Sequence, residues 1–132
     1  MSMSDPIADL LTRVRNASKA KKGAVTVSFS TINQSILEIF KSEGYIKDFK
    51  IENLAGTKKE IIVDLKYVNK QAAFKELKRI SRPGRRIYIA SGDIKPVYNN
   101  MGLGILSTSH GVMTSVSARR QGVGGEFLCQ IF

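Results

Sequence analysis

Apolar residues recur along the chain with two different spacings, and each spacing predicts one kind of element. A helical spacing follows Asp5-Pro6, a pair typical of a helix start, because Asp caps free amides and Pro fits the first turn. We therefore predict a helix that ends at about Asn16. Its buried face consists of Ile7, Leu10, Leu11 and Val14. The next residues, 18–23, are expected to form a short basic loop.

Two further helices are predicted from similar signals. Thr31 and Gln34 have the spacing of a capping box, and Gly44 ends the helix that they open. The apolar face of this helix consists of Ile32, Ile36, Leu37 and Phe40. A short helix closed by Gly122 is expected within 114–122.

Apolar and polar residues alternate at 25–29, as is typical of a half-buried strand, and further strand-like runs follow along the chain. Two of these runs predict a hairpin that turns at Gly56. A turn is expected at 81–86, around Pro83-Gly84. The segment 69–80 fits a helix and a strand equally well, and 96–104 fits either an irregular crossing or a single helical turn. Strands are predicted at 25–29, 45–52, 60–67, 86–91, 104–109 and 126–132.

The order of these elements indicates an α+β fold, because strands and helices do not alternate strictly as they do in a parallel, doubly wound sheet. A length of 132 residues suits one compact domain or two small subdomains.

The net charge of the chain indicates which kind of partner it binds. The chain has 21 Lys and Arg against 11 Asp and Glu, a formal net charge of +10. Such an excess favours a polyanionic partner, most often a nucleic acid. We expect a cytoplasmic protein with no membrane partner, because no apolar run is long enough for a membrane helix and the start lacks a signal peptide. Cys129 lies in an apolar run, which predicts a buried, reduced thiol.

Catalysis and cofactor binding are not expected. His110 is the single histidine, and the "STSHG" around it lacks the first glycine of a nucleophile elbow and any later histidine. One His and one Cys do not make a structural zinc site. The "GLGIL" at 102–106 lacks the third glycine of a dinucleotide fingerprint. We therefore predict no enzyme, metal or cofactor.

Basic residues cluster in three places, and each cluster taken alone is also compatible with a solvated surface. The main cluster holds six basic residues against one Glu: Lys75, Lys78, Arg79, Arg82, Arg85 and Arg86. The others are Lys19, Lys21 and Lys22, and Lys58 and Lys59. Such side chains neutralise phosphates and carry little sequence information.

A hydroxyl- and glycine-rich segment follows. Ser107, Thr108 and Ser109 at a strand end suit sugar hydroxyls, phosphates and base edges. Gly124 and Gly125 would let another backbone approach closely. The alternative is a polar hairpin loop that needs flexible glycines.

Five stretches resemble the family of bacterial small-subunit ribosomal protein eight, in the family's order and over nearly the whole chain. They are "DPIADLLTRVRNA" at 5–17, "EGYIKDF" at 43–49, "RISRPGRRIY" at 79–88, "GLGILSTSHGVMT" at 102–114 and "GGEFLC" at 124–129.

The resemblance implies two α+β subdomains, 1–67 and 68–132, of which the second holds the main RNA surface. It implies direct binding to the central domain of small-subunit ribosomal RNA, and a role in assembling the platform. Ribosomal proteins five and twelve would be neighbours, and the messenger RNA of the protein's own operon a possible second target.

Carried over by motif, the RNA contacts fall on the hydroxyl triplet 107–109, with the segment 124–126 opposite and Tyr88 nearby. Glu126 would accept from a base amino group or brace the loop. Two departures from the family's pattern stand out. His110 replaces the usual Lys or Gln, which leaves that contact open, and Ser115 and Ser117 replace acids at a helix start, which predicts a frayed helix.

Two rival functions remain at this point. A hydrolase that uses Ser109 is disfavoured by the missing downstream histidine. A DNA-binding regulator is disfavoured because no predicted helix carries a recognition face of Arg, Asn and Gln. The residues expected to bind RNA are Tyr88, Arg82, Arg85, Arg86, Ser107, Thr108, Ser109, His110, Gly124, Gly125 and Glu126.

Overall fold

The computed structural model describes residues 5–95 and 102–132, which form two compact units. One unit is Pro6–Phe74, and the other is Lys75–Phe132 together with Asp5. Helices and antiparallel sheets occur in an order without strand–helix alternation. The predicted α+β class is therefore confirmed. The boundary placed after Tyr67 stays a prediction.

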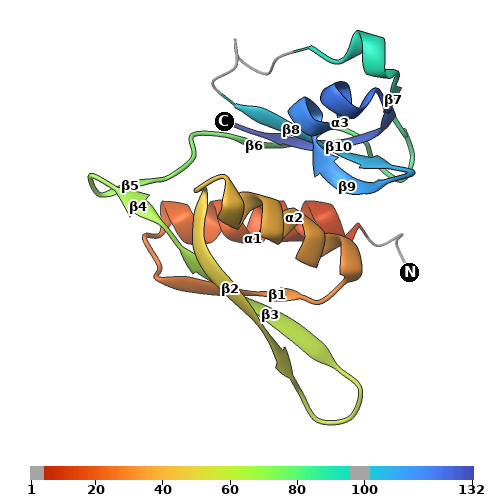
Figure 1. Cartoon of the computed structure of the whole chain (residues 1–132). Helices are drawn as coiled ribbons and strands as arrows, with labels where there is room; N and C mark the ends of the chain where they lie inside the picture. Colours follow the sequence, from red (N-terminus) through yellow and green to blue (C-terminus); the bar gives the residue numbers. More distant parts are fainter. Residues whose placement is uncertain (1–4, 96–101) are drawn as a thin grey trace. The chain divides into compact units, whose positions relative to one another are not determined.

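The Pro6–Phe74 unit packs two helices on one face of an antiparallel sheet (Figure 1). Its strands lie in the order β1-β3-β2. The elements are α1 (Pro6–Lys19), β1 (Ala24–Ser28), α2 (Thr31–Ser42), β2 (Ile46–Asn53) and β3 (Lys59–Leu65). The short strands β4 (Tyr67–Val68) and β5 (Gln71–Ala72) pair with each other. The helix faces predicted from periodicity are buried except at Ile32, which is half-buried, and Leu10, Val14, Ile36 and Phe40 are fully inaccessible.

The β2–β3 hairpin and its turn at Gly56 are confirmed, and this glycine has a positive φ of 78°. Two predicted boundaries are wrong. Helix α1 continues past Asn16 to Lys19, because Ala17 and Ser18 are also buried and extend its inner face.

The cap of α2 is also one residue earlier than predicted. The side chain of Ser30, rather than Thr31, accepts a hydrogen bond from the Asn33 amide, at 3.1 Å. The Asn33 side chain is buried, where it donates to the carbonyls of Pro6 and Ser28. These contacts tie the first turn to its neighbours and favour this register.

The Lys75–Phe132 unit is built on an antiparallel sheet of order β6-β10-β8-β9, in which β7 also pairs with β10. Its core beside α3 contains Ile94, Leu106 and Ala118, with Phe127 packed against them. The elements are β6 (Leu77–Arg79), β7 (Tyr88–Ile89), the 3-10 turn η1 (Ser91–Asp93), β8 (Leu103–Thr108), β9 (Gly111–Thr114), α3 (Ser115–Gln121) and β10 (Gly125–Ile131).

The segment 69–80, whose sequence fits a helix and a strand equally well, contains the short strands β5 and β6 and no helix. The predicted strand at 86–91 is reduced to Tyr88–Ile89, because the chain turns into η1 directly afterwards. Helix α3 ends at Gly122 as predicted, with a left-handed φ of 72°. Residues 96–101, most of the segment predicted as an irregular crossing or a helical turn, lie outside the described residues. Strand β8 begins at Leu103.

Candidate nucleic-acid interface

Three strands bring predicted site residues into one line. Glu126 on β10 lies directly opposite Ser107 on β8 and, on its other side, opposite Tyr88 on β7. Directly opposed residues of antiparallel strands point their side chains to the same face. Ser107, Glu126 and Tyr88 therefore form a line across three strands, here called the polar row. The adjacent pair, Leu106 and Phe127, points to the other face and joins the core beside α3.

The three hydroxyls at the end of β8 have different surroundings. Thr108 Oγ1 donates to the Gly111 carbonyl at 2.8 Å and accepts from the His110 amide at 3.0 Å, so it holds the turn between β8 and β9. Among the residues that the structure describes, Ser107 and Ser109 have no side-chain hydrogen-bond partner, and Ser109 is exposed. Two of the three hydroxyls are therefore available to a ligand.

The glycines at the start of β10 allow neighbouring strands to approach closely. A Cβ at Gly125 would lie 2.2 Å from the Ser107 carbonyl oxygen, and one at Gly124 would lie 2.4 Å from the Ile89 carbonyl oxygen. Real Cβ atoms do not come this close to backbone, so both positions need glycine. The predicted close approach is confirmed, and the approaching backbone belongs to β7 and β8 of the same chain.

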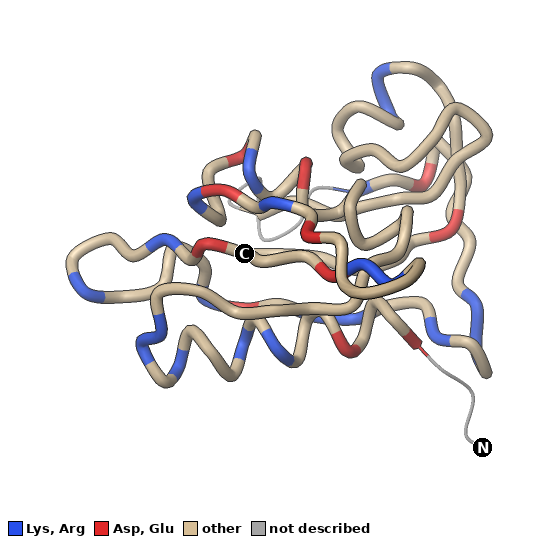
Figure 2. Tube along the Cα trace, turned by 90° about the horizontal axis from the view of Figure 1, so that it is seen from below, with Lys and Arg blue, Asp and Glu red and all other residues tan. Residues whose placement is uncertain are grey.

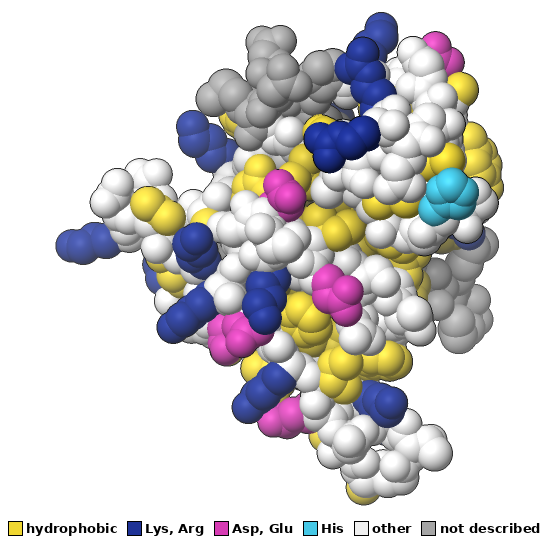
Figure 3. Space-filling model, viewed as in Figure 1, with side chains coloured by type: hydrophobic (Ala, Val, Ile, Leu, Met, Phe, Trp, Pro, Cys, Tyr) yellow, Lys and Arg dark blue, Asp and Glu magenta, His cyan; other side chains and the backbone are white. Residues whose placement is uncertain are grey.

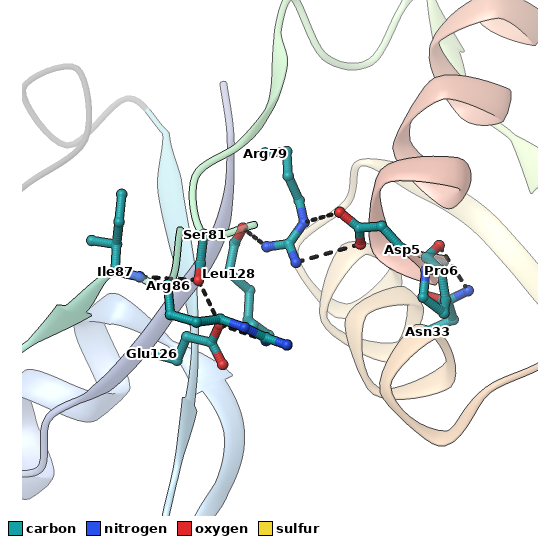
Figure 4. A network of polar contacts seen from close by, with 9 residues as sticks. All are labelled: Asp5, Pro6, Asn33, Arg79, Ser81, Arg86, Ile87, Glu126 and Leu128. Atoms are coloured by element: carbon teal, nitrogen blue, oxygen red, sulfur yellow. Dashed lines mark hydrogen bonds and ion pairs between the residues drawn. The ribbon is translucent and has the colours of Figure 1, made fainter. Parts of the chain in front are cut away.

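Glu126 is held from one side by two donors (Figure 4). The Ser81 hydroxyl donates to its Oε2, and Arg86 donates to the same oxygen at 3.0 Å. Burial raises the pKa of Glu126, but the hydrogen bonds from Ser81 and Arg86, with the charges of Arg86 and Arg79, outweigh it and lower the pKa overall. Glu126 is therefore a fixed anion that braces the loop, one of the two roles expected for it.

A tight turn presents two arginines. The backbone groups of Arg82 and Arg85 exchange hydrogen bonds of 3.0 and 2.9 Å around Pro83-Gly84. Both residues are exposed, and neither side chain has a partner among residues 5–95 and 102–132. Together with Lys78 they line a shallow hollow at the surface. This segment, Arg82–Arg85, is here called the arginine turn, and its free cations suit phosphates.

Arg79 differs from the rest of its cluster. Its side chain is only 9% exposed and donates to the Leu128 carbonyl and to both carboxylate oxygens of Asp5. Three of its N–H donors are thus used by internal acceptors, which sets Arg79 apart from the exposed cations of its cluster. Sequence reasoning also missed Ser81, whose burial and two hydrogen bonds leave no signal in a "SRPG" turn.

His110 lies at the tip of the β8–β9 turn and is exposed. Its Nδ1 lies 3.3 Å from Gln121 Oε1 on α3. The imidazole therefore contacts an amide rather than a serine, which leaves the hydrolase hypothesis without a base. Cys129 is completely buried, and this burial raises the pKa of its thiol to about 12, as expected for a structural cysteine.

Within the described ranges, no group of three or more His, Cys, Asp or Glu side chains could hold a metal ion. No helix in those ranges combines the length and apolar character that a membrane crossing needs.

The other lysine clusters are partly engaged within their own unit. Lys21 lies over the Tyr67 ring, 5.7 Å from its centroid, and Lys59 lies 5.2 Å from the centroid of Phe29. Lys and Arg follow helices and loops along the chain (Figure 2). On the face seen in Figure 3 their side chains stand apart from one another. The positive charges are thus spread over the surface, whereas the polar row is a defined arrangement of side chains.

Comparison with known proteins gives this arrangement a context. The family model of ribosomal protein S8 matches residues 5–132. The chain is 47% identical over 132 residues, all of both chains, to the small ribosomal subunit protein uS8 of Bartonella henselae. It is 49% identical over 129 residues, 98% of each chain, to the protein of that name from Neisseria meningitidis serogroup B. The Rhodospirillum centenum protein of that name is 42% identical over the full length.

These matches define the class first: the chain is a protein of the small ribosomal subunit, so it associates with ribosomal RNA and other ribosomal proteins. Within that class it belongs to the ribosomal protein S8 family. The family is one of structural ribosomal proteins and not of enzymes. The resemblance found in the sequence motifs is therefore confirmed.

Proposed function

We propose that this protein binds the central domain of small-subunit ribosomal RNA directly and helps to assemble the platform of the subunit. The observation that carries the proposal is the polar row beside the arginine turn. Ser107 and Ser109 supply hydroxyls without internal partners in the described chain, and Tyr88, 71% exposed, supplies an aromatic face. Single-stranded or irregular RNA is recognised by such stacking and hydrogen bonding.

The arginine turn and the polar row have separate tasks in this proposal. Arg82 and Arg85 attract any RNA by neutralising phosphates, and the neutral hydroxyls distinguish one RNA from another. Arg86 also neutralises charge, but it is bonded to Glu126 and so contributes less to the field outside the protein. His110, beside Ser109, takes the position where the resemblance leads us to expect a contact.

The same surface would serve a second RNA. A messenger RNA from the protein's own operon that mimics the ribosomal site would meet the same row, and binding there would repress translation in the cytoplasm. Ribosomal proteins five and twelve are the proposed protein neighbours in the assembled subunit.

Footprinting of the protein on small-subunit ribosomal RNA tests the proposal. We expect protection confined to an irregular helix of the central domain, with affinity that falls steeply with salt. For the double variant Arg82→Gln/Arg85→Gln, the slope of log affinity against log salt should become shallower by about 0.7–0.9 for each phosphate that is no longer neutralised. The affinity should fall about equally for cognate and scrambled RNA. Protection outside the central domain, or a slope unchanged by the double variant, would contradict the proposal.

A further inference from the structure

The two edges of the β1-β3-β2 sheet differ in their protection against pairing with a further strand. At one edge, β2 has a bulge between Ile46 and Asp48, and half of its side chains are charged. Bulges and charged side chains are the devices with which proteins keep edge strands from pairing with other chains. At the other edge, β1 reads "AVTVS", and its pairing with β3 has no register shift. It carries neither a charge nor a proline, so β1 is an unprotected edge.

The backbone of β1 offers hydrogen-bonding groups along this edge. In an antiparallel pair, residues that exchange hydrogen bonds alternate with residues whose N–H and C=O groups point away from the partner strand. The Leu65 amide donates to the Gly23 carbonyl at 2.9 Å, so Gly23 is a hydrogen-bonded position. Ala24 and Thr26, one and three residues later, are therefore outward positions. Both are exposed, and their backbone groups have no partner among the described residues.

The face of the sheet that the helices cover would receive apolar side chains of an added strand. Figure 1 shows α1 and α2 on the same side of this sheet. On that side Val27 is buried and Val25 is half-buried, and α1 packs against β1. Side chains alternate between the faces of a strand. Every second residue of an added strand would thus extend the apolar layer at the valines.

The open face of the sheet would receive a cation. Asp64 on β3 lies opposite Ala24 and, on its other side, opposite Asp48 on β2. Directly opposed like charges destabilise a sheet. Asp48 forms an ion pair with Lys41 at 3.0 Å, whereas Asp64 has no side-chain partner among the described residues. A cation beside Asp64 would therefore relieve a repulsion that the chain itself leaves uncompensated.

A basic, extended protein segment satisfies both the edge and the face. An added strand beside β1 would lie two strand spacings from β3, about 9–10 Å. A lysine or arginine side chain from that strand reaches the carboxylate of Asp64 over the methyl group of Ala24, the small residue between them. We propose that β1 is a docking site for an extended protein segment in which apolar and basic residues alternate, bound as a fourth strand of this sheet.

The chemistry of the edge favours such a segment over two other occupants. RNA has no ladder of backbone amides to pair with a strand, and Asp64 repels phosphate. A second copy of β1 would bring no cation, because "AVTVS" contains no Lys or Arg. The site belongs to the Pro6–Phe74 unit, whereas the polar row belongs to the other unit. The inference therefore goes beyond the proposed function.

Two substitutions test the edge and the face separately. Thr26→Pro removes an outward N–H and leaves the ladder with β3 intact, since edge strands tolerate proline where the N–H faces solvent. Its control is Thr26→Val, which keeps the N–H. Asp64→Asn removes the charge at nearly constant shape. Its control is Asp48→Asn, the same change in the same row at an aspartate that Lys41 already neutralises.

The probe is a synthetic peptide in which valine and lysine alternate, titrated onto the isotope-labelled full chain at physiological salt. Charges more than about 8 Å apart are largely screened there, so the net positive charge of the chain opposes binding little. With the native chain, the amide signals of Ala24 and Thr26 should shift and their hydrogen exchange should slow. Thr26→Pro should weaken binding roughly tenfold. Asp64→Asn should weaken it roughly 2- to 5-fold, and more than Asp48→Asn does.

Thermal unfolding shows which variants are folded, and Asp64→Asn keeps the test decisive if Thr26→Pro is not. Equal binding by the native chain and folded Thr26→Pro, or shifts confined to residues away from β1, would overturn the docking site. Equal binding of a peptide in which glutamate replaces lysine would overturn the basic character of the partner. A dimer of the native chain that Thr26→Pro abolishes, or slower exchange at Ala24 and Thr26 with ribosomal RNA alone, would assign the edge to another occupant and also overturn the proposal.

Discussion

The two ends of the β8–β10 strand pair differ sharply although the backbone pairing continues through both. At one end Leu103 and Ile105 lie opposite Ile131 and Cys129, and all four side chains are buried. At the other end Ser107 lies opposite Glu126, and Thr108 lies opposite Gly125. The buried end stabilises the fold through apolar area removed from water. The polar end contributes little to that burial, and the Ser107 hydroxyl there has no partner among the described residues.

A β-bulge makes this division possible. The register shifts between Phe127 and Cys129, so Leu128 is the extra residue of β10. Side chains alternate along a regular strand, and residues three apart would point to opposite faces. Because of the bulge, Glu126 and Cys129 lie on the same face, opposite Ser107 and Ile105. One face of the strand pair therefore carries both the buried end and the polar end.

The largest expected effect comes from the position where the two strands approach most closely. In Gly125→Ala the new Cβ would meet the Ser107 carbonyl oxygen, and backbone must shift to make room. We expect the free energy of unfolding to fall by about 3 kcal/mol, the upper end of the range for overpacking. Urea unfolding measures it. Gly92→Ala is the matched control, since nothing lies within 4 Å of the position its methyl group would take, and it should change stability by less than about 0.5 kcal/mol. Equal midpoints for both variants would show that the close approach is not required.

A smaller effect on the free energy of unfolding is expected at the buried end. Cys129→Ser places a hydroxyl in the apolar strand and should cost about 1 kcal/mol or more. The native thiol has a pKa of about 12 against 9.0 for an ordinary cysteine, so the folded state binds this proton more tightly. Its contribution is complete below pH 9 and is lost as the pH rises toward 12, by at most about 1.4 kcal/mol per pH unit.

The pH dependence is checked by comparing urea unfolding of the native chain and Cys129→Ala in alkaline buffers. Alkylation of the folded native protein should also be far slower than that of free cysteine. A thiol that reacts as fast as free cysteine would contradict the burial of Cys129.

Periodicity predicts the elements whose apolar faces are complete. The face of α1 and most of the face of α2 follow directly from spacing, whereas β8 and β10 are recognised as apolar runs and not by alternation. The segment 69–80 allows no decision because Leu77 is its only buried residue, so neither period can be read. The spacing places the α2 cap one residue late because Ser30 and Thr31 are both good caps, and the choice depends on tertiary contacts of Asn33.

The site is predictable in its residue types but not in its internal bonds. The hydroxyl triplet, the glycine pair and Tyr88 are identified from the sequence, and strand register brings Ser107, Tyr88 and Glu126 together. That Thr108 is engaged while Ser107 is free, or that Arg79 is half-buried while Arg82 is exposed, depends on the folded arrangement of the strands. The bulge at Leu128 has no signal in the alternation of "EFLCQIF", since several of its residues are apolar.

The most direct test of the polar end measures the affinity of variants of the three neighbouring hydroxyl residues for cognate and scrambled RNA at two salt concentrations. Ser107→Ala and Ser109→Ala should each weaken cognate binding by roughly 0.5–1.5 kcal/mol, with unchanged salt slope, unchanged binding to scrambled RNA and unchanged thermal stability. Thr108→Val is the matched control: it should lower stability because it removes two turn hydrogen bonds. If the serine variants lose affinity for both RNAs equally, or lose binding only because they unfold, the polar end is an ordinary polar loop and the account is wrong.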